Sequence, residues 1–200
     1  VALLAAALWL TGCASGPYDL VQLTPTPTYR ASEKPLGPVH VRLETDRRPP
    51  RERGVRKYPG RSYLGGNALT EPTGVSLLRV LARDLEVAGV GREAGLMARD
   101  EGYVLGVTVE HLSASYNDGV ETLVPVLPTS AIKARCEVRL VLRDLVGRVY
   151  LDKTFAAERR AVAALVTGIQ STAASTLGAA LRALSDEILP VVEQAVPAFW

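Results

Sequence analysis

The chain has 200 residues, of which 48% are hydrophobic, enough for a single domain with a sizeable core. Its 23 Lys and Arg nearly balance its 21 Asp and Glu, so the overall charge gives no indication of nucleic-acid binding. The chain has only two cysteines, Cys13 and Cys136, too few for a disulfide framework.

Residues 1–10 are apolar and uncharged. A bilayer span needs about 20 such residues, whereas this run has the length of the apolar region of a secretory signal. It is followed by Leu-Thr-Gly-Cys13, an order that resembles the lipobox of bacterial lipoproteins. The resemblance implies that residues 1–12 are a signal peptide and that Cys13 is acylated as a membrane anchor. By the same resemblance, Ala14 and Ser15, with no Asp after the cysteine, imply the periplasmic face of a Gram-negative outer membrane.

The next segment, residues 13–38, is rich in Pro and Thr and predicts a flexible tether that carries the lipidated cysteine. Residues 39–200 are then expected to form a single periplasmic α/β domain. Its first strand is predicted at residues 39–46, where apolar and polar residues alternate. After an irregular stretch, residues 74–88 have the spacing of a helix, with Thr73 as N-cap and Gly89 as the stop.

Three further strands are predicted, at residues 103–116, at residues 132–144 and, after a turn at Gly147, from residue 149 onward. Cys136 lies on the apolar side of the second of these strands, as a small core residue would. A long helix should cover about residues 167–196, kinked or broken at Pro190. This order predicts a two-layer α/β sandwich in which a mainly antiparallel sheet of about four strands has two helices packed on one face.

The order of elements, Asp46-Arg47 at the end of the first strand, and the turn from Asp144 to Gly147 together resemble the YajG-type bacterial lipoproteins. The auxiliary lipoproteins of ABC-type transport systems share much of this plan. The resemblance implies a non-enzymatic outer-membrane lipoprotein that acts as an accessory or scaffold component of an envelope assembly. The alternative that it leaves open is an auxiliary lipid-handling subunit of an ABC-type transport system.

No motif for catalysis stands out in the sequence. The two histidines, His40 and His111, lie on different strands, and no cysteine pair has zinc-ligand spacing. Neither a nucleophile elbow nor a phosphate-binding loop is present. We therefore expect no enzymatic activity, no catalytic residue, no metal and no cofactor.

A basic cluster lies within residues 47–61, where Glu52 is the only acid. Guanidinium groups bind phosphates well, so this cluster predicts an anionic partner, although a solvated loop would carry the same charges. The outward-facing cations of the strand at residues 132–144, Lys133, Arg135, Arg139 and Arg143, favour the anionic partner. The cluster consists of Arg47, Arg48, Arg51, Arg53, Arg56, Lys57 and Arg61.

Two apolar or uncharged surfaces predict a protein contact, either with an envelope partner or by self-association. One is the loop that contains Leu123, Val124, Val126 and Leu127, which either folds back on the core or binds a partner. The other lies on the last helix, because no charge occurs from residue 161 to residue 181. Its predicted contact residues are Ile169, Thr172 and Thr176, unless the N-terminal tether covers this face within one chain.

Overall fold

The computed structural model describes residues 18–31, 37–53, 62–63, 69, 71–95, 102–116, 129–164 and 168–196. The helices are α2 (Leu20–Leu23), the 3-10 helix η1 (Pro50–Arg53), α3 (Thr73–Ala88) and α4 (Ile169–Ala195). The strands are β1 (Pro38–Asp46), β2 (Ser62–Tyr63), β3 (Arg92–Gly95), β4 (Tyr103–Tyr116), β5 (Thr129–Asp144) and β6 (Val149–Ala164). Among the helices of these residues, none is long and apolar enough to cross a membrane.

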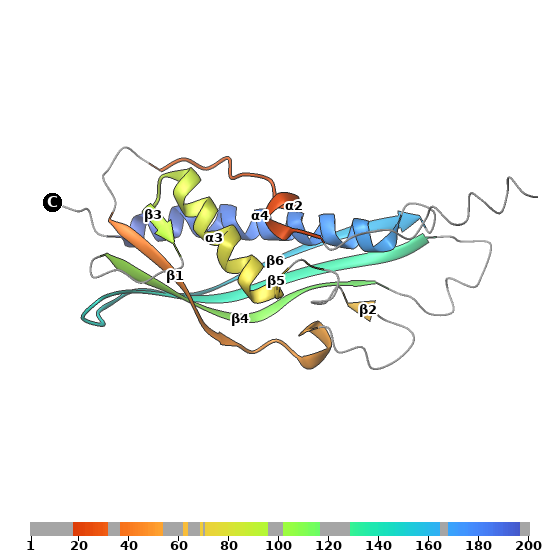
Figure 1. Ribbon diagram of the computed structural model, residues 1–200, viewed down its shortest axis with the longest axis horizontal. Coiled ribbons are helices and arrows are strands. Elements are labelled where there is room, and N and C mark those ends of the chain that lie inside the picture. The colour runs from red at the N-terminus through yellow and green to blue at the C-terminus, as the bar shows by residue number, and fades with distance from the viewer. Residues whose placement is uncertain are drawn as a thin grey trace, which may run out of the picture.

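The strands form one mixed sheet in the order β3-β1-β4-β5-β6, and β2 adds to β4. Strands β4, β5 and β6 are an antiparallel meander, whereas β1 is parallel to both β3 and β4. Figure 1 shows α3 and α4 on one side of this sheet and η1 on the other. The predicted two-layer α/β class is therefore confirmed, with a parallel β1 added to the antiparallel meander.

The core lies between the sheet and the two long helices. Alternate residues of β5, from Ile132 to Leu142, are buried, and Cys136 is among them, as the period-two pattern predicts. Leu177, Leu181 and Leu184 of α4 are at most 1% exposed and face the same layer. Burial raises the pKa of the Cys136 thiol, which keeps it protonated and unreactive.

The helix boundaries differ from the prediction in two details. The N-cap of α3 is Pro72, with Thr73 as the first helical residue, because the fixed φ of proline suits the entry to a helix. Gly89 ends α3 with φ 75°, as expected for a left-handed C-cap. We predicted a kink or a break at Pro190; helix α4 runs through this residue as one helix, so the break is wrong. Leu189 and Val192, both buried, hold the helix to the core on either side of the proline.

The predicted flexible tether is also shorter than expected. Residues 18–31, which we call the N-terminal strap, lie across α3 and α4 on the side away from the sheet (Figure 1). Leu20 is 0% exposed, and Thr24 is 2% exposed. The composition did not predict this docked segment, because the contacts that hold it to the domain are made with residues far along the chain.

Candidate functional site

The strap begins with a single short helix. The side chain of Asp19 accepts a hydrogen bond from the backbone N–H of Val21 at 2.9 Å and caps α2. At the other end of α2, the Thr24 hydroxyl donates to the carbonyl of Leu20 at 2.6 Å. This small helix places the buried side chain of Leu20 against the core and directs the carbonyls that follow toward α3 and α4.

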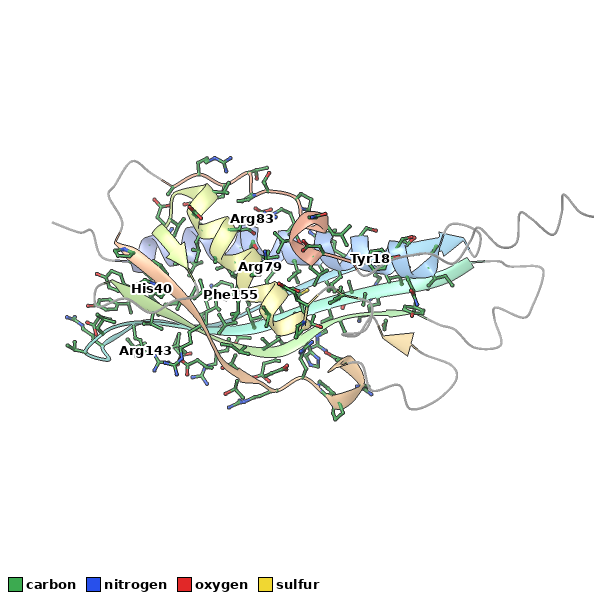
Figure 2. All side chains as sticks on the ribbon, in the orientation of Figure 1. Tyr18, His40, Arg79, Arg83, Arg143 and Phe155 are labelled. Carbon is green, nitrogen blue, oxygen red and sulfur yellow. The ribbon has the colours of Figure 1, made fainter. Side chains whose placement is uncertain are left out.

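Two arginines, one from each long helix, hold these carbonyls. Arg83 of α3 donates from Nη1 to the carbonyl oxygens of Val21 at 2.5 Å and Thr24 at 3.0 Å. Arg182 of α4 donates from Nη1 to the carbonyl oxygen of Pro25 at 2.7 Å. Figure 2 shows Arg83 on the strap side of α3. The two guanidinium groups therefore satisfy backbone acceptors that α2 leaves unpaired at its C-terminal end.

A buried carboxylate balances the charge of both arginines. Asp84 is 0% exposed, and its Oδ1 accepts hydrogen bonds from Nε and Nη2 of Arg83 at 2.9 and 2.8 Å. Its Oδ2 lies 3.2 Å from Nη2 of Arg182, an ion pair rather than an aligned hydrogen bond. Asp186 lies 3.3 Å from Nε of Arg182 on the exposed side. We call Arg83, Asp84 and Arg182 the strap clamp.

The strap also touches α4 directly and is held at its far end. A Cβ on Gly178 would lie 2.5 Å from the carbonyl oxygen of Leu23, so only glycine permits this approach. Farther along, the Tyr29 hydroxyl donates to the Glu193 carboxylate. This hydrogen bond, together with burial, raises the pKa of Tyr29 to about 12. The backbone N–H of Ala31 then donates to the carbonyl of Ala88 at 2.7 Å.

The predicted contact face of α4 is partly covered within the chain. Thr176 is 6% exposed, and its hydroxyl donates to the carbonyl of Thr172 at 2.6 Å. Ile169 and Thr172 are half-buried at the start of the helix and remain a predicted contact. The missing charge on α4 thus has an intramolecular cause on the side of Gly178, where the strap is docked.

The first part of the basic cluster is paired with carboxylates. Arg48 is 5% exposed, and its Nη2 and Nε bind Asp46 at 2.6 and 2.9 Å. Arg47 reaches Glu110 at 3.4 Å. Arg51 is exposed on η1. The side chain of Arg53, together with Arg56, Lys57 and Arg61, lies outside the described residues. The prediction of an anionic partner therefore rests mainly on cations that the structure does not describe.

Glu52, the acid within the basic cluster, turns toward the sheet. It is 5% exposed, with Oε1 at 2.9 Å from Nδ1 of His111 and Oε2 accepting from the backbone N–H of Leu112 at 3.3 Å. These contacts lie beside an irregularity in the register of β4 and β5, between Val109 and His111. Glu52 therefore serves a structural role by satisfying a backbone donor where the ladder is interrupted.

The outer face of the sheet, away from the helices, carries the four outward-facing cations predicted for β5. Each has a carboxylate partner: Lys133 with Glu158, Arg135 with Glu137, Arg139 with Asp152, and Arg143 with Glu44. Figure 2 shows Arg143 on this side of the sheet. The paired cations hold the pKa of Asp152 and of Glu158 below their usual range, through hydrogen bonds from Arg139 and from Lys133. This pairing lowers the positive electrostatic potential of the outer face, and so weakens its attraction for an anion.

An open hollow of about 450 Å³ occupies one end of this outer face. It lies where β5 begins and β6 ends. No sequence motif predicted its apolar floor or the cations beside it. The pairing of Ala131 with Val162 and of Lys133 with Arg160 brings the two strands together here. The residues that line it are Ser115, Ala131, Ile132, Lys133, Arg160, Ala161 and Val162.

Two predicted sites lie wholly outside the described residues. These are the acylated Cys13 and the apolar loop with Leu123, Val124, Val126 and Leu127. The strap clamp was not predicted from the sequence, because adjacent Arg83 and Asp84 look like an ordinary exposed pair on a helix. Among the described residues, no group of three His, Cys, Asp or Glu is placed to hold a metal ion.

Comparisons with known proteins give a fold but no family. Neither the family models nor the curated proteins contain a match to this sequence. The structure is similar to the crystal structure of a Xanthomonas campestris protein assigned to DUF330, with a TM-score of 0.55 and 18% identity over 86% of this chain and 91% of that chain. At this identity the likeness shows a shared fold alone.

A weaker likeness is to a minor lipoprotein from Acinetobacter baumannii. The TM-score is 0.42 and the identity 14%, over 80% of this chain and 97% of that chain. This similarity is too low to support an assignment of function.

Proposed function

We propose that the protein is a lipid-anchored envelope lipoprotein that acts without catalysis, as an accessory or scaffold component at the periplasmic face of an outer membrane. The observation that carries this proposal is the docked strap. Its first described residue, Tyr18, follows Cys13 by only five positions. An anchor that enters a folded domain through a clamped segment holds that domain at a short distance from the membrane, as a scaffold requires.

The interior of the domain is consistent with this role. The layer between the sheet and helices is occupied by large side chains that are less than 2% exposed, among them Leu77, Leu105, Leu140 and Leu177. A protein that carries lipid inside its fold needs an apolar cavity in this layer. The partner of the scaffold, an envelope protein or a second copy, would meet the surfaces that remain accessible, including the half-buried Ile169 and Thr172.

The experiment that tests the anchor is the substitution Cys13→Ser in cells. Acylation of one cysteine with several chains gives nearly permanent membrane attachment, because each buried methylene contributes about 0.8 kcal/mol. The wild type should sediment with the outer membrane, and the variant should be lost from that fraction. Cys136→Ser is the matched control and should leave the protein in the membrane. A Cys13→Ser variant that stays in the outer membrane would contradict the proposal.

The second candidate is an auxiliary lipid-handling subunit of an ABC-type transport system. The open hollow by Ala131 and Val162 is the observation that favours it, because an apolar floor beside cations suits an amphiphile. Co-purification with transporter subunits, or a phospholipid retained in native mass spectrometry, would support this candidate over the scaffold. Loss of that lipid in Val162→Glu would assign it to the hollow.

A further inference from the structure

The strap and α4 run in the same direction, and this sets where the anchor enters the domain. Leu23 lies against Gly178, Pro25 is bound by Arg182, and Tyr29 is bound by Glu193. Followed backward toward Cys13, the strap therefore heads for the start of α4. That start lies just after the end of β6, and Figure 2 shows Tyr18 toward this end of the hairpin formed by β5 and β6.

The reach of the anchor is short compared with the length of this hairpin. Five steps of extended chain from Cys13 to Tyr18 span at most about 18 Å. The 16 residues of β5 extend over about 50 Å. A bilayer that holds Cys13 is therefore close to the open end of the hairpin, where β5 begins and β6 ends. The turn at Val146, at the opposite end, lies far from it.

At the described part of the open end, the cations of the outer face outnumber the carboxylates that they pair with. Lys133 and Arg160 share one carboxylate, Glu158, at 2.8 and 2.9 Å. Among the described residues, two cations therefore share one carboxylate on this part of the outer face, whereas Arg139 and Arg143, farther along the sheet, each have a carboxylate of their own.

Apolar groups lie beside these cations, nearer the open end of the hairpin. Val162 is 69% exposed, and it pairs with the exposed Ala131 across the floor of the hollow. Cationic side chains beside a small apolar surface match the anionic headgroups and upper acyl chains of a phospholipid layer. We call Ala131, Lys133, Arg160 and Val162 the anchor-side corner.

We propose that the anchor-side corner rests on the anionic surface of the bilayer that holds Cys13, with the turn at Val146 directed away from the membrane. This orientation rests on the proposed lipid anchor. It goes beyond that anchor because it states which end of the domain meets the headgroups, and through which residues.

The test compares one reporter at each end of the hairpin. Val162→Cys and Val146→Cys place a reactive thiol at positions that are 69% and 91% exposed, whereas Cys136 is 0% exposed and its burial prevents labelling. The acylated full-length variants are labelled with a fluorophore and reconstituted into vesicles of phosphatidylethanolamine and phosphatidylglycerol. The vesicles also contain a lipid that carries a quencher on its headgroup.

The expected result is strong quenching at position 162 and only background quenching at position 146. Replacing both Lys133 and Arg160 with Gln should reduce quenching at position 162, and so should vesicles of phosphatidylcholine alone. Equal quenching at the two ends, or stronger quenching at position 146, would overturn the orientation while leaving the anchor intact. Mass spectrometry that finds Cys13 unacylated would overturn the proposed anchor and this orientation together.

Discussion

The two faces of this domain use the same residue types in opposite ways. On the helix side, Arg83 and Arg182 meet Asp84, which is 0% exposed, and together they hold a segment of backbone. On the outer face of the sheet, ion pairs such as Arg139 with Asp152 join only two side chains, which are 48% and 43% exposed. A carboxylate withdrawn from water needs its partners, whereas an exposed one exchanges them for water at little cost. The comparison teaches that the buried strap clamp fixes the position of a backbone segment, whereas the exposed ion pairs do not.

The substitution with the largest expected effect is Asp84→Asn. It leaves two arginines beside a neutral amide, and loss of one partner from a buried ion cluster typically lowers the free energy of unfolding by about 3 kcal/mol. The strap should also become accessible, because Arg83 and Arg182 lose the group that orients them. Urea unfolding measures the first effect, and limited proteolysis within residues 18–31 measures the second.

The matched control is Asp152→Asn on the outer face, which removes the carboxylate partner of Arg139. We expect no measurable change in the unfolding midpoint or in proteolysis of the strap, because this pair is solvated. Equal losses of stability in Asp84→Asn and Asp152→Asn would break the distinction between the two faces.

Gly178→Ala should have the next largest effect. Alanine favours a helix interior over glycine by about 1 kcal/mol, but a Cβ at 2.5 Å from the carbonyl of Leu23 requires the strap to move. Forced overpacking costs about 1–3 kcal/mol, so the clash should outweigh the gain in helix propensity. Thermal unfolding should show a net loss of stability, and Ser175→Ala, an exposed position on the same helix, should show almost none. A more stable Gly178→Ala variant with an intact strap would contradict the close approach.

The sequence predicted the elements whose signals are local. The alternation in β5 and the apolar row of α4 identify both elements, because each pattern lies within a single strand or helix. The parallel pairing of β1 with β4 could not be derived in this way, because it depends on the path of the chain through α3. The charge-free stretch of α4 did indicate a second packing surface, but the strap packs on the side of Gly178, and a partner at Ile169 and Thr172 stays a prediction.

The strap clamp has no local signal of this kind. Arg83 and Asp84 are adjacent, so they do not follow the three- or four-residue spacing of helix pairs, and Arg182 comes about 100 residues later. Leu20 and Leu23 lie among prolines and threonines without periodicity. The burial of this segment arises from tertiary contacts that no short window of sequence contains.

The smallest effect concerns the far end of the strap and depends on pH. Tyr29 donates to Glu193, and its pKa is raised to about 12, above the usual value near 10. The protonated hydroxyl therefore stabilises the folded state below about pH 10, and this contribution is lost as the pH rises through about 12. Tyr29→Phe should lower the free energy of unfolding by about 1 kcal/mol near neutral pH. The difference in free energy of unfolding between wild type and variant, measured by urea unfolding, should disappear as the pH rises from about 10 to about 12. A difference that does not change with pH would contradict the hydrogen bond between Tyr29 and Glu193.

Hydrogen exchange of the strap in the wild-type protein tests the central claim most directly. The backbone N–H groups of Leu23, Thr24 and Ala31 all donate to carbonyl oxygens, at 3.0, 2.9 and 2.7 Å. If the strap is clamped, these three amides should exchange slowly in the wild type and approach the rate of an unstructured peptide in Asp84→Asn, while the amides of β5 remain protected. Exchange of the wild-type strap at the rate of an unstructured peptide would contradict the account.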